Sequence, residues 1–138
     1  MALYYRVDTE LKVVFSLCRE TIAESDVAQH LATVAQHSTF SPAYSHLIDC
    51  SEITSLEISP AFIRTIAAGK WFSSRARCAI VAPQDYIFGT VRMFQIQHRG
   101  ALEVFRDLHV ARTWLGIGEA NLPAPAMPNT CAALHKSV

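Results

Sequence analysis

The side chains best suited to metal binding or nucleophilic chemistry in this sequence are its six histidines and four cysteines. His30 and His37 are the best-spaced histidine pair, because seven residues return a helix to the same face. Seven residues also rise about 10.5 Å, whereas two imidazoles on one zinc ion bring their nitrogens within about 4 Å of each other. The pair cannot chelate one metal from an unbroken helix, so we predict no metal site and no cofactor.

The four cysteines are widely separated, at Cys18, Cys50, Cys78 and Cys131. No two of them have the close spacing of a zinc knuckle or a redox motif. Cys18, Cys50 and Cys78 lie in or beside apolar runs, where a reduced cysteine packs as a small hydrophobic residue. We therefore predict that these three are unpaired and buried.

Serine and carboxylate residues offer other routes to catalysis. The chain contains no G-x-S-x-G nucleophile motif, and Ser59, directly before Pro60, has the position of a helix N-cap. Asp49 and Glu52 follow a predicted strand, where open α/β sheets place ligand sites. Acid–base catalysis also needs two groups in different environments and a base within reach of substrate, which the sequence does not indicate. We predict that the protein is not an enzyme.

Two features have the composition of an anion site. Gly116-Ile117-Gly118 lacks the third glycine of a dinucleotide-binding motif and follows a predicted helix, so we interpret it as a helix C-cap. Arg75 and Arg77, with Lys70, could meet an anionic group, but a solvated turn between a helix and a strand is the favoured interpretation.

Composition excludes several classes of partner. The 138 residues are 51% hydrophobic and only 17% charged, with 12 basic and 12 acidic residues. A neutral chain with scattered arginines does not attract phosphate backbones, so we predict no nucleic-acid partner. No apolar run approaches the roughly 20 residues that span a bilayer, and the N-terminus lacks the regions of a signal peptide. We predict a cytoplasmic protein without a membrane span.

The elements that must position these residues are predicted from hydrophobic periodicity. Two β-rich runs joined by a polar turn predict an antiparallel hairpin, and alternating strand and helix patterns then favour a largely parallel sheet covered by helices. We expect a polar loop at Ser51-Glu52 and N-caps at Ser25-Asp26, Ser59 and Asp85. The predicted order is β-β-α-β-α-β-α-β-α, with strands at 3–7, 12–17, 46–50, 78–82 and 103–106 and helices at 25–37, 59–72, 85–98 and 109–115.

The helix predicted at 85–98 has a wider apolar arc than one sheet face can cover. One stripe consists of Ile87, Val91 and Phe94, and a second consists of Gly89, Met93 and Ile96. We predict that the second stripe is a subunit interface or an apolar ligand face. Self-association, most simply as a homodimer, is the expected consequence.

The chain is predicted to form one domain over residues 1–118. Residues 119–138 contain three prolines within six positions and no apolar periodicity. We therefore predict a flexible tail that is dispensable for folding.

The order of elements resembles that of the STAS-like bacterial family. The phrases that carry the resemblance are LIDC at 47–50, AIVAP at 79–83, FGTVRMF at 88–94, VFRD at 104–107 and ARTWL at 111–115. Small cytosolic members of this family are called SpoIIAA-like, after the anti-sigma-factor antagonists of sporulation, and are also likened to lipid-binding domains. The resemblance covers residues 3 to 116 and implies a single STAS-like α/β domain.

The antagonists carry an Asp-Ser-Ser-Gly stretch before a helix, and a partner kinase phosphorylates its second serine. Aligned without gaps from Asp49, that stretch falls on residues 57–60, where Ser59 is retained and Pro60 replaces the glycine. The resemblance implies Ser59 as a phosphorylation site. A phosphate there would lie at a helix N-terminus, which favours negative charge.

The sequence therefore predicts a non-catalytic, STAS-like binding or regulatory module. Two alternatives stay open. One is a carrier that holds a lipid or another small apolar ligand between the sheet and the helices at about residues 59–72 and 85–98. The other is a phospho-regulated protein-interaction switch that uses Ser59.

Overall fold

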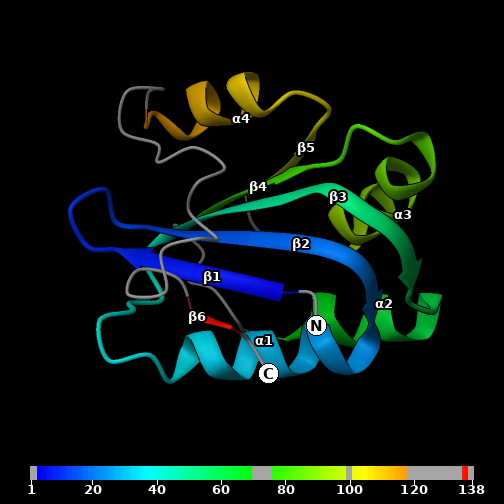
Figure 1. The fold of residues 1–138 in the computed structure, drawn as a ribbon, viewed down its shortest axis with the longest axis horizontal. Coiled ribbons are helices and arrows are strands. Elements are labelled where there is room, and N and C mark those ends of the chain that lie inside the picture. The colour runs from blue at the N-terminus through cyan, green and yellow to red at the C-terminus, as the bar shows by residue number, and fades with distance from the viewer. Residues whose placement is uncertain (1–2, 70–75, 99–100, 118–134, 137–138) are drawn as a thin grey trace.

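The computed structural model describes residues 3–69, 76–98, 101–117 and 135–136, which form a six-stranded mixed sheet with helices on both faces (Figure 1). The sheet order is β5-β4-β3-β2-β1-β6. β1 is antiparallel to β2 and β6, and β2 to β5 are parallel neighbours. The strands are β1 (Leu3–Asp8), β2 (Val13–Ala23), β3 (Ser45–Glu57), β4 (Arg77–Val81), β5 (Ala101–Phe105) and β6 (His135–Lys136). The helices are α1 (Glu24–Ala35), α2 (Pro60–Ala68), α3 (Asp85–Gln97) and α4 (Leu108–Leu115). The predicted α/β class, with its N-terminal hairpin and its order from β1 to α4, is confirmed.

The helices form two unequal layers: α1, α2 and α3 cover one face of the sheet, and α4 covers the other (Figure 1). β4 shows why both layers are needed. Its Cys78 and Ile80 pack in the core under the three helices, whereas Ala79 and Val81 pack against the α4 side. All four side chains are buried, which confirms the prediction of a central strand covered on both faces.

Two strands are longer than their sequence pattern predicted. β3 continues to Glu57, so the polar loop expected at Ser51-Glu52 is wrong. The second half of β3 pairs in parallel with an extended β2, where Ile22 lies opposite Leu56. The β2 extension crosses two register shifts, and Glu20 has a φ of 58° there. Backbone pairing between distant segments therefore outweighs the polar composition that favoured a loop.

The start of α2 and the end of α4 agree with the predicted helix signals. Ser59 is the N-cap of α2, and its Oγ accepts a hydrogen bond from the Phe62 N–H at 3.1 Å. Gly116 is the C-cap of α4, with a φ of 74° that only glycine adopts without strain.

Two predicted N-caps are one or two residues out of place. The N-cap of α1 is Ala23 rather than Ser25, and the Asp26 carboxylate accepts a hydrogen bond from the Ala23 N–H at 2.8 Å. α3 begins at Asp85 itself, and its N-cap is Gln84. In both places an acidic residue in the first turn suits the positive end of the helix dipole without occupying the cap.

Two residues of the predicted tail are described, and they form a short strand. His135 and Lys136 form β6, which pairs with Tyr5 and Tyr4 at the edge of β1. Residues 118–134, which make up most of the predicted tail, lie outside the described part of the chain. Within the described residues, no helix is long and apolar enough to cross a membrane.

Candidate functional site

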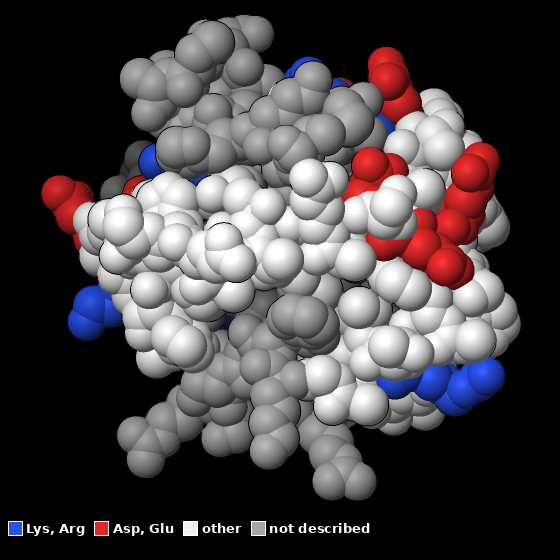
Figure 2. All heavy atoms as spheres, turned by 90° about the horizontal axis from the view of Figure 1, so that it is seen from below, with Lys and Arg blue, Asp and Glu red and all other residues white. Residues whose placement is uncertain are grey.

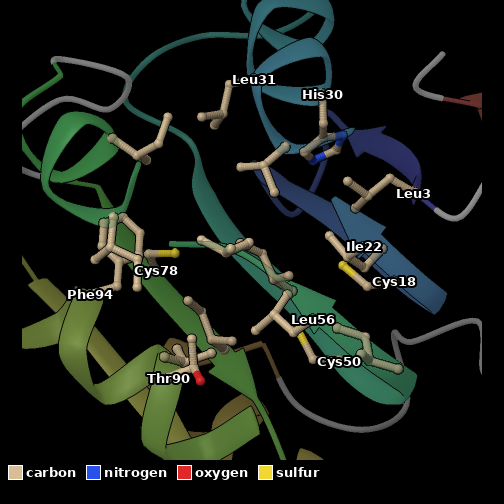
Figure 3. Close-up of a pocket in the computed structure, with 18 residues that line it drawn as sticks. Leu3, Cys18, Ile22, His30, Leu31, Cys50, Leu56, Cys78, Thr90 and Phe94 are labelled. Atoms are coloured by element: carbon tan, nitrogen blue, oxygen red, sulfur yellow. The ribbon is translucent and has the colours of Figure 1, made fainter. Parts of the chain in front are cut away.

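The main candidate site is a cavity of about 140 Å³ between the sheet and the layer of α1, α2 and α3 (Figure 3). The described residues that line it include no Asp, Glu, Lys or Arg. Several of the lining side chains, such as Leu31, Ile58 and Phe94, are half-buried, which places one side of the cavity toward solvent. The sheet contributes Leu3, Cys18, Ile22, Ile48, Cys50, Ile53, Leu56, Cys78 and Ile80, and the helices and the residue before α2 contribute Val27, His30, Leu31, Ile58, Ile63, Ile66, Thr90, Val91 and Phe94.

The unexpected extensions of β2 and β3 build one end of this cavity. They bring Ile22, Ile53 and Leu56 into its wall. The Tyr86 hydroxyl of α3 donates to the Leu56 carbonyl at 2.6 Å and accepts from the Leu56 N–H at 3.0 Å. Gln84 adds a hydrogen bond from Nε2 to the Ser51 carbonyl at 2.8 Å. These contacts fix the start of α3 on the part of β3 that sequence analysis took for a loop.

A hydrogen bond joins the starts of α1 and α2 on either side of the cavity. The Ser59 N–H donates to the Glu24 carboxylate at 2.8 Å. Hydrogen bonds from the backbone and the side chain of Ser59 lower the pKa of Glu24. Apart from this hydrogen bond, α1 packs on β1 and β2, whereas α2 packs on α3. The cavity therefore lies between α1 on one side and the pair of α2 and α3 on the other.

Three buried, unpaired thiols line the cavity, as the sequence predicted for Cys18, Cys50 and Cys78 (Figure 3). They come from three neighbouring strands: β2, β3 and β4. A hydrogen bond with Cys50 and burial raise the pKa of Cys18 well above its usual value, and burial raises that of Cys78 to about 12. These two thiols are therefore protonated at neutral pH and are poor nucleophiles. Cys131 lies outside the described residues.

His30 is the most polar side chain in the cavity wall. Its Nε2 shares a 3.0 Å hydrogen bond with the hydroxyl of Ser16, which is also buried. Burial lowers the pKa of His30 to about 4, so the imidazole is neutral at pH 7. From its sequence pattern His30 was a candidate only for metal binding, and the buried pair with Ser16 was not predicted. The spacing of 14 residues between strand and helix carries no local signal for it.

Behind His30 lies a cluster of aromatic and histidine rings. The ring of Tyr5 makes edge contacts with both His30 and His37, at centroid distances of 5.7 and 5.6 Å. His46 is buried against the edge of Phe40, and burial, followed by the charge of His30, lowers its pKa to about 3. The described residues hold no group of three His, Cys, Asp or Glu side chains that could bind a metal ion.

Ser59, the residue that the family resemblance implies for phosphorylation, is exposed at the N-terminus of α2. The helix N-terminus favours a negative charge there. The Glu24 carboxylate, bonded to the same serine, opposes a second negative charge.

The two predicted carboxylates are occupied by local partners. Asp49 Oδ1 accepts hydrogen bonds from the N–H and the hydroxyl of Ser51, at 2.9 and 2.6 Å. Glu52 forms an ion pair with Arg19 at 3.0 Å. The structure does not bring either of them into the cavity wall.

Of the residues that the sequence suggested for an anion site, Arg77 and Gly116 are described, and both have structural roles. The Arg77 guanidinium lies over the Trp114 ring, 4.8 Å from its centroid, and donates to the Trp114 carbonyl. Gly116 caps α4, as interpreted from the sequence. Lys70, Arg75 and Gly118 lie outside the described residues.

The two stripes of α3 face opposite surroundings. Ile87, Val91 and Phe94 pack on the core under the three helices, as predicted. Gly89, Met93 and Ile96 are exposed, with 39% of Met93 and 77% of Ile96 accessible to solvent. If Gly89 carried a Cβ atom, that atom would have no neighbour within 4 Å apart from the adjacent residues and the backbone of its own helix.

The face formed by the helical layer carries little charge over much of its area (Figure 2). From Val27 to Ile48, which includes most of α1, the sequence contains no Asp, Glu, Lys or Arg. Acidic side chains gather toward one side of this face in Figure 2. The α1 side of the cavity is therefore covered by a stretch of chain without charged side chains.

Comparison with known proteins gives a likeness of fold. The sequence matches no protein-family model, and no curated protein matches it in sequence. A solved structure of an uncharacterised protein of the DUF3478 family with a SpoIIAA-like fold, from Shewanella loihica PV-4, superposes with a TM-score of 0.52 and 21% sequence identity. The match covers 75% of this chain and 83% of that chain. This chain therefore has the SpoIIAA-like α/β fold that the sequence resemblance predicted.

Proposed function

We propose that this protein is a non-catalytic binding module that holds a small apolar molecule between its sheet and its three-helix layer. The observation that carries the proposal is the cavity of about 140 Å³, whose described lining residues include no charged side chain. Interiors of folded proteins are close-packed, and a cavity of this size forgoes packing that would otherwise stabilise the core. A bound apolar molecule would recover those contacts.

The neutral state of the polar groups in the wall supports binding rather than catalysis. The pKa of His30 is too low for a general base at neutral pH, and the pKa values of Cys18 and Cys78 are too high for thiolate nucleophiles. The Ser59 switch receives less support, because Glu24 already places a carboxylate against the serine that would carry the phosphate.

Native mass spectrometry of the purified full chain, followed by solvent extraction, tests the proposal. We expect a copurified small molecule in the wild-type protein and much less of it in Cys78→Leu, because the larger side chain fills part of the cavity. Met93→Leu, on the exposed side of α3, is the matched control and should retain the molecule. The proposal fails if the wild-type protein carries no bound molecule and saturating toluene does not raise its Tm.

We also propose that the exposed stripe of Gly89, Met93 and Ile96 mediates self-association. Its support is the exposure of two large apolar side chains beside a glycine that leaves room for a close approach. The same native mass spectra report the number of subunits.

A further inference from the structure

The size of the cavity limits what can be enclosed in it. Its volume of about 140 Å³ is close to that of an engineered protein cavity of about 150 Å³, lined by similar aliphatic and aromatic side chains, that binds benzene. A long acyl chain has several times the volume of a benzene ring. The cavity therefore matches one ring or a short branched chain, and it cannot enclose a whole lipid tail.

The charge state of the wall limits the ligand further. Among the described lining residues, the titratable groups are His30 and three thiols. The imidazole is neutral. A hydrogen bond with Cys50 and burial favour the protonated thiol at Cys18, and burial favours it at Cys78. An ionised ligand group would lose its hydration and gain no opposite charge in return.

The hydrogen-bonding groups of the wall already have partners within the protein. His30 Nε2 is bonded to Ser16, and the Thr90 hydroxyl donates to the Tyr86 carbonyl at 3.1 Å. The remaining polar groups are thiols, which are weak donors. A ligand oxygen enclosed here would therefore exchange its bonds from water for weak bonds from thiols at best.

The cysteine sulfur atoms in the cavity wall favour a ligand with an aromatic ring over one with an aliphatic chain. Cys18, Cys50 and Cys78 line the sheet side, and Phe94 lines the side of α3 (Figure 3). Sulfur atoms make favourable contacts with aromatic rings, and ring edges pack well on another ring.

We infer, on the basis of the proposed function, that the cavity takes a neutral, compact group of about one aromatic ring in preference to a carboxylate or a long acyl chain, which it cannot enclose whole. The cavity has the volume of such a group, its described wall is uncharged, and His30 and Thr90 are already hydrogen-bonded within the protein.

Titration of the full chain with four probes tests this inference: toluene, phenol, benzoate and palmitate. Binding is followed by amide chemical shifts of cavity residues and by Tm at pH 7. We expect toluene to bind at least about a hundredfold more tightly than benzoate, which has the same ring and a charge, with phenol between them. Palmitate should bind the cavity more weakly than toluene.

The comparison among probes uses the wild-type protein, so it does not depend on the folding of a variant. Cys78→Leu should weaken toluene binding, and Met93→Leu should leave it unchanged. Palmitate or benzoate binding as tightly as toluene would overturn the inferred ligand class but leave the proposed function standing. If none of the four probes binds, the ligand class is wrong, and the proposed function is wrong as well if the native mass spectra show no copurified molecule.

Discussion

Ser59 shows how a single side chain joins two helices beside the cavity. Its hydroxyl caps α2 through the Phe62 N–H, and its own N–H donates to Glu24 at the start of α1. The cap was predictable from the sequence, because Ser followed by Pro is a local signal. The link to Glu24 spans 35 residues and has no local signal.

Ser59→Ala should lower the free energy of unfolding by about 1 kcal/mol, because it removes the acceptor of the Phe62 N–H. Urea denaturation measures this difference. Ser25→Ala is the control: the structure places Ser25 inside α1, with Ala23 as the N-cap. Its effect should stay within about 0.5 kcal/mol. Equal losses in the two variants would contradict the assignment of the caps.

His30 and His46 should make the protein sensitive to acid. Their pKa values are lowered from 6.5 to about 4 and about 3 by burial. Below pH 6.5 the unfolded chain takes up protons on both imidazoles, whereas the folded chain does not until pH approaches the lowered values. Their contribution to stability is therefore complete above pH 6.5 and is lost as pH falls from there toward about 4 for His30 and about 3 for His46.

We expect this loss to reach about 1.4 kcal/mol per pH unit for each histidine. The free energy of unfolding, measured in urea between pH 7 and pH 4.5, checks the slope. Replacing both residues, His30→Gln with His46→Gln, should flatten it. His109→Gln, at an exposed position, should not. An unchanged slope in the double variant would mean that other groups dominate the acid response.

At the scale of elements, α3 has one apolar stripe that packs on the core and a second apolar stripe that is exposed to solvent. Phe94 packs on the core and lines the cavity, whereas Met93, the preceding residue, is exposed. The helical turn of about 100° per residue is enough to place adjacent side chains in opposite surroundings.

Phe94→Ala should therefore destabilise the protein by about 3 kcal/mol, because it removes a packed ring and enlarges the cavity. Met93→Asp should change the free energy of unfolding by less than about 0.5 kcal/mol. If the stripe mediates self-association, the same charge should shift the protein toward monomers in sedimentation velocity. A wild-type protein that is already monomeric, or unchanged association in Met93→Asp, would rule out this interface.

β2 and β3 show how strand pairing overrides local composition. Residues 51–57 of β3 include two glutamates, two serines and a threonine, which favour a loop by composition. They form strand because β2 supplies a parallel partner for their backbone groups. The one signal in the sequence was the apolar pair Ile53 and Leu56, whose side chains reach the cavity.

At the scale of the whole molecule, β6 links the end of the described chain to its beginning. His135 and Lys136 pair with Tyr5 and Tyr4, so the edge of the sheet is partly covered at β1. This pairing joins segments that are about as far apart in sequence as the chain allows.

Truncation after Gly118 removes β6 and should lower the free energy of unfolding by no more than about 2 kcal/mol. A two-residue bridge supplies only a few backbone hydrogen bonds, each with a net contribution of about 1 kcal/mol. Thermal melts of the truncated and full-length chains compare the two. A loss well above this value would show that the tail contributes more than the β6 pairing, and the prediction that it is dispensable would be wrong.

Much of the architecture was predictable from the sequence alone. Apolar periodicity gave the order of elements from β1 to α4, the buried run at residues 78–82 indicated the central strand, and the cysteines in apolar runs indicated buried thiols. These features are local, because side-chain periodicity and capping depend on neighbouring residues only.

The cavity was decided only by the tertiary structure. It requires α1 on one side, α2 and α3 on the other, and the paired extensions of β2 and β3 at one end. The Ser16–His30 bond and the Glu24–Ser59 link likewise join residues from different elements. The cavity is the space that remains between the sheet and the three helices. Its size depends on the distances between these elements, which are set by contacts across the whole sheet. The sequence could predict the side chains that face inward, but not the space left between them.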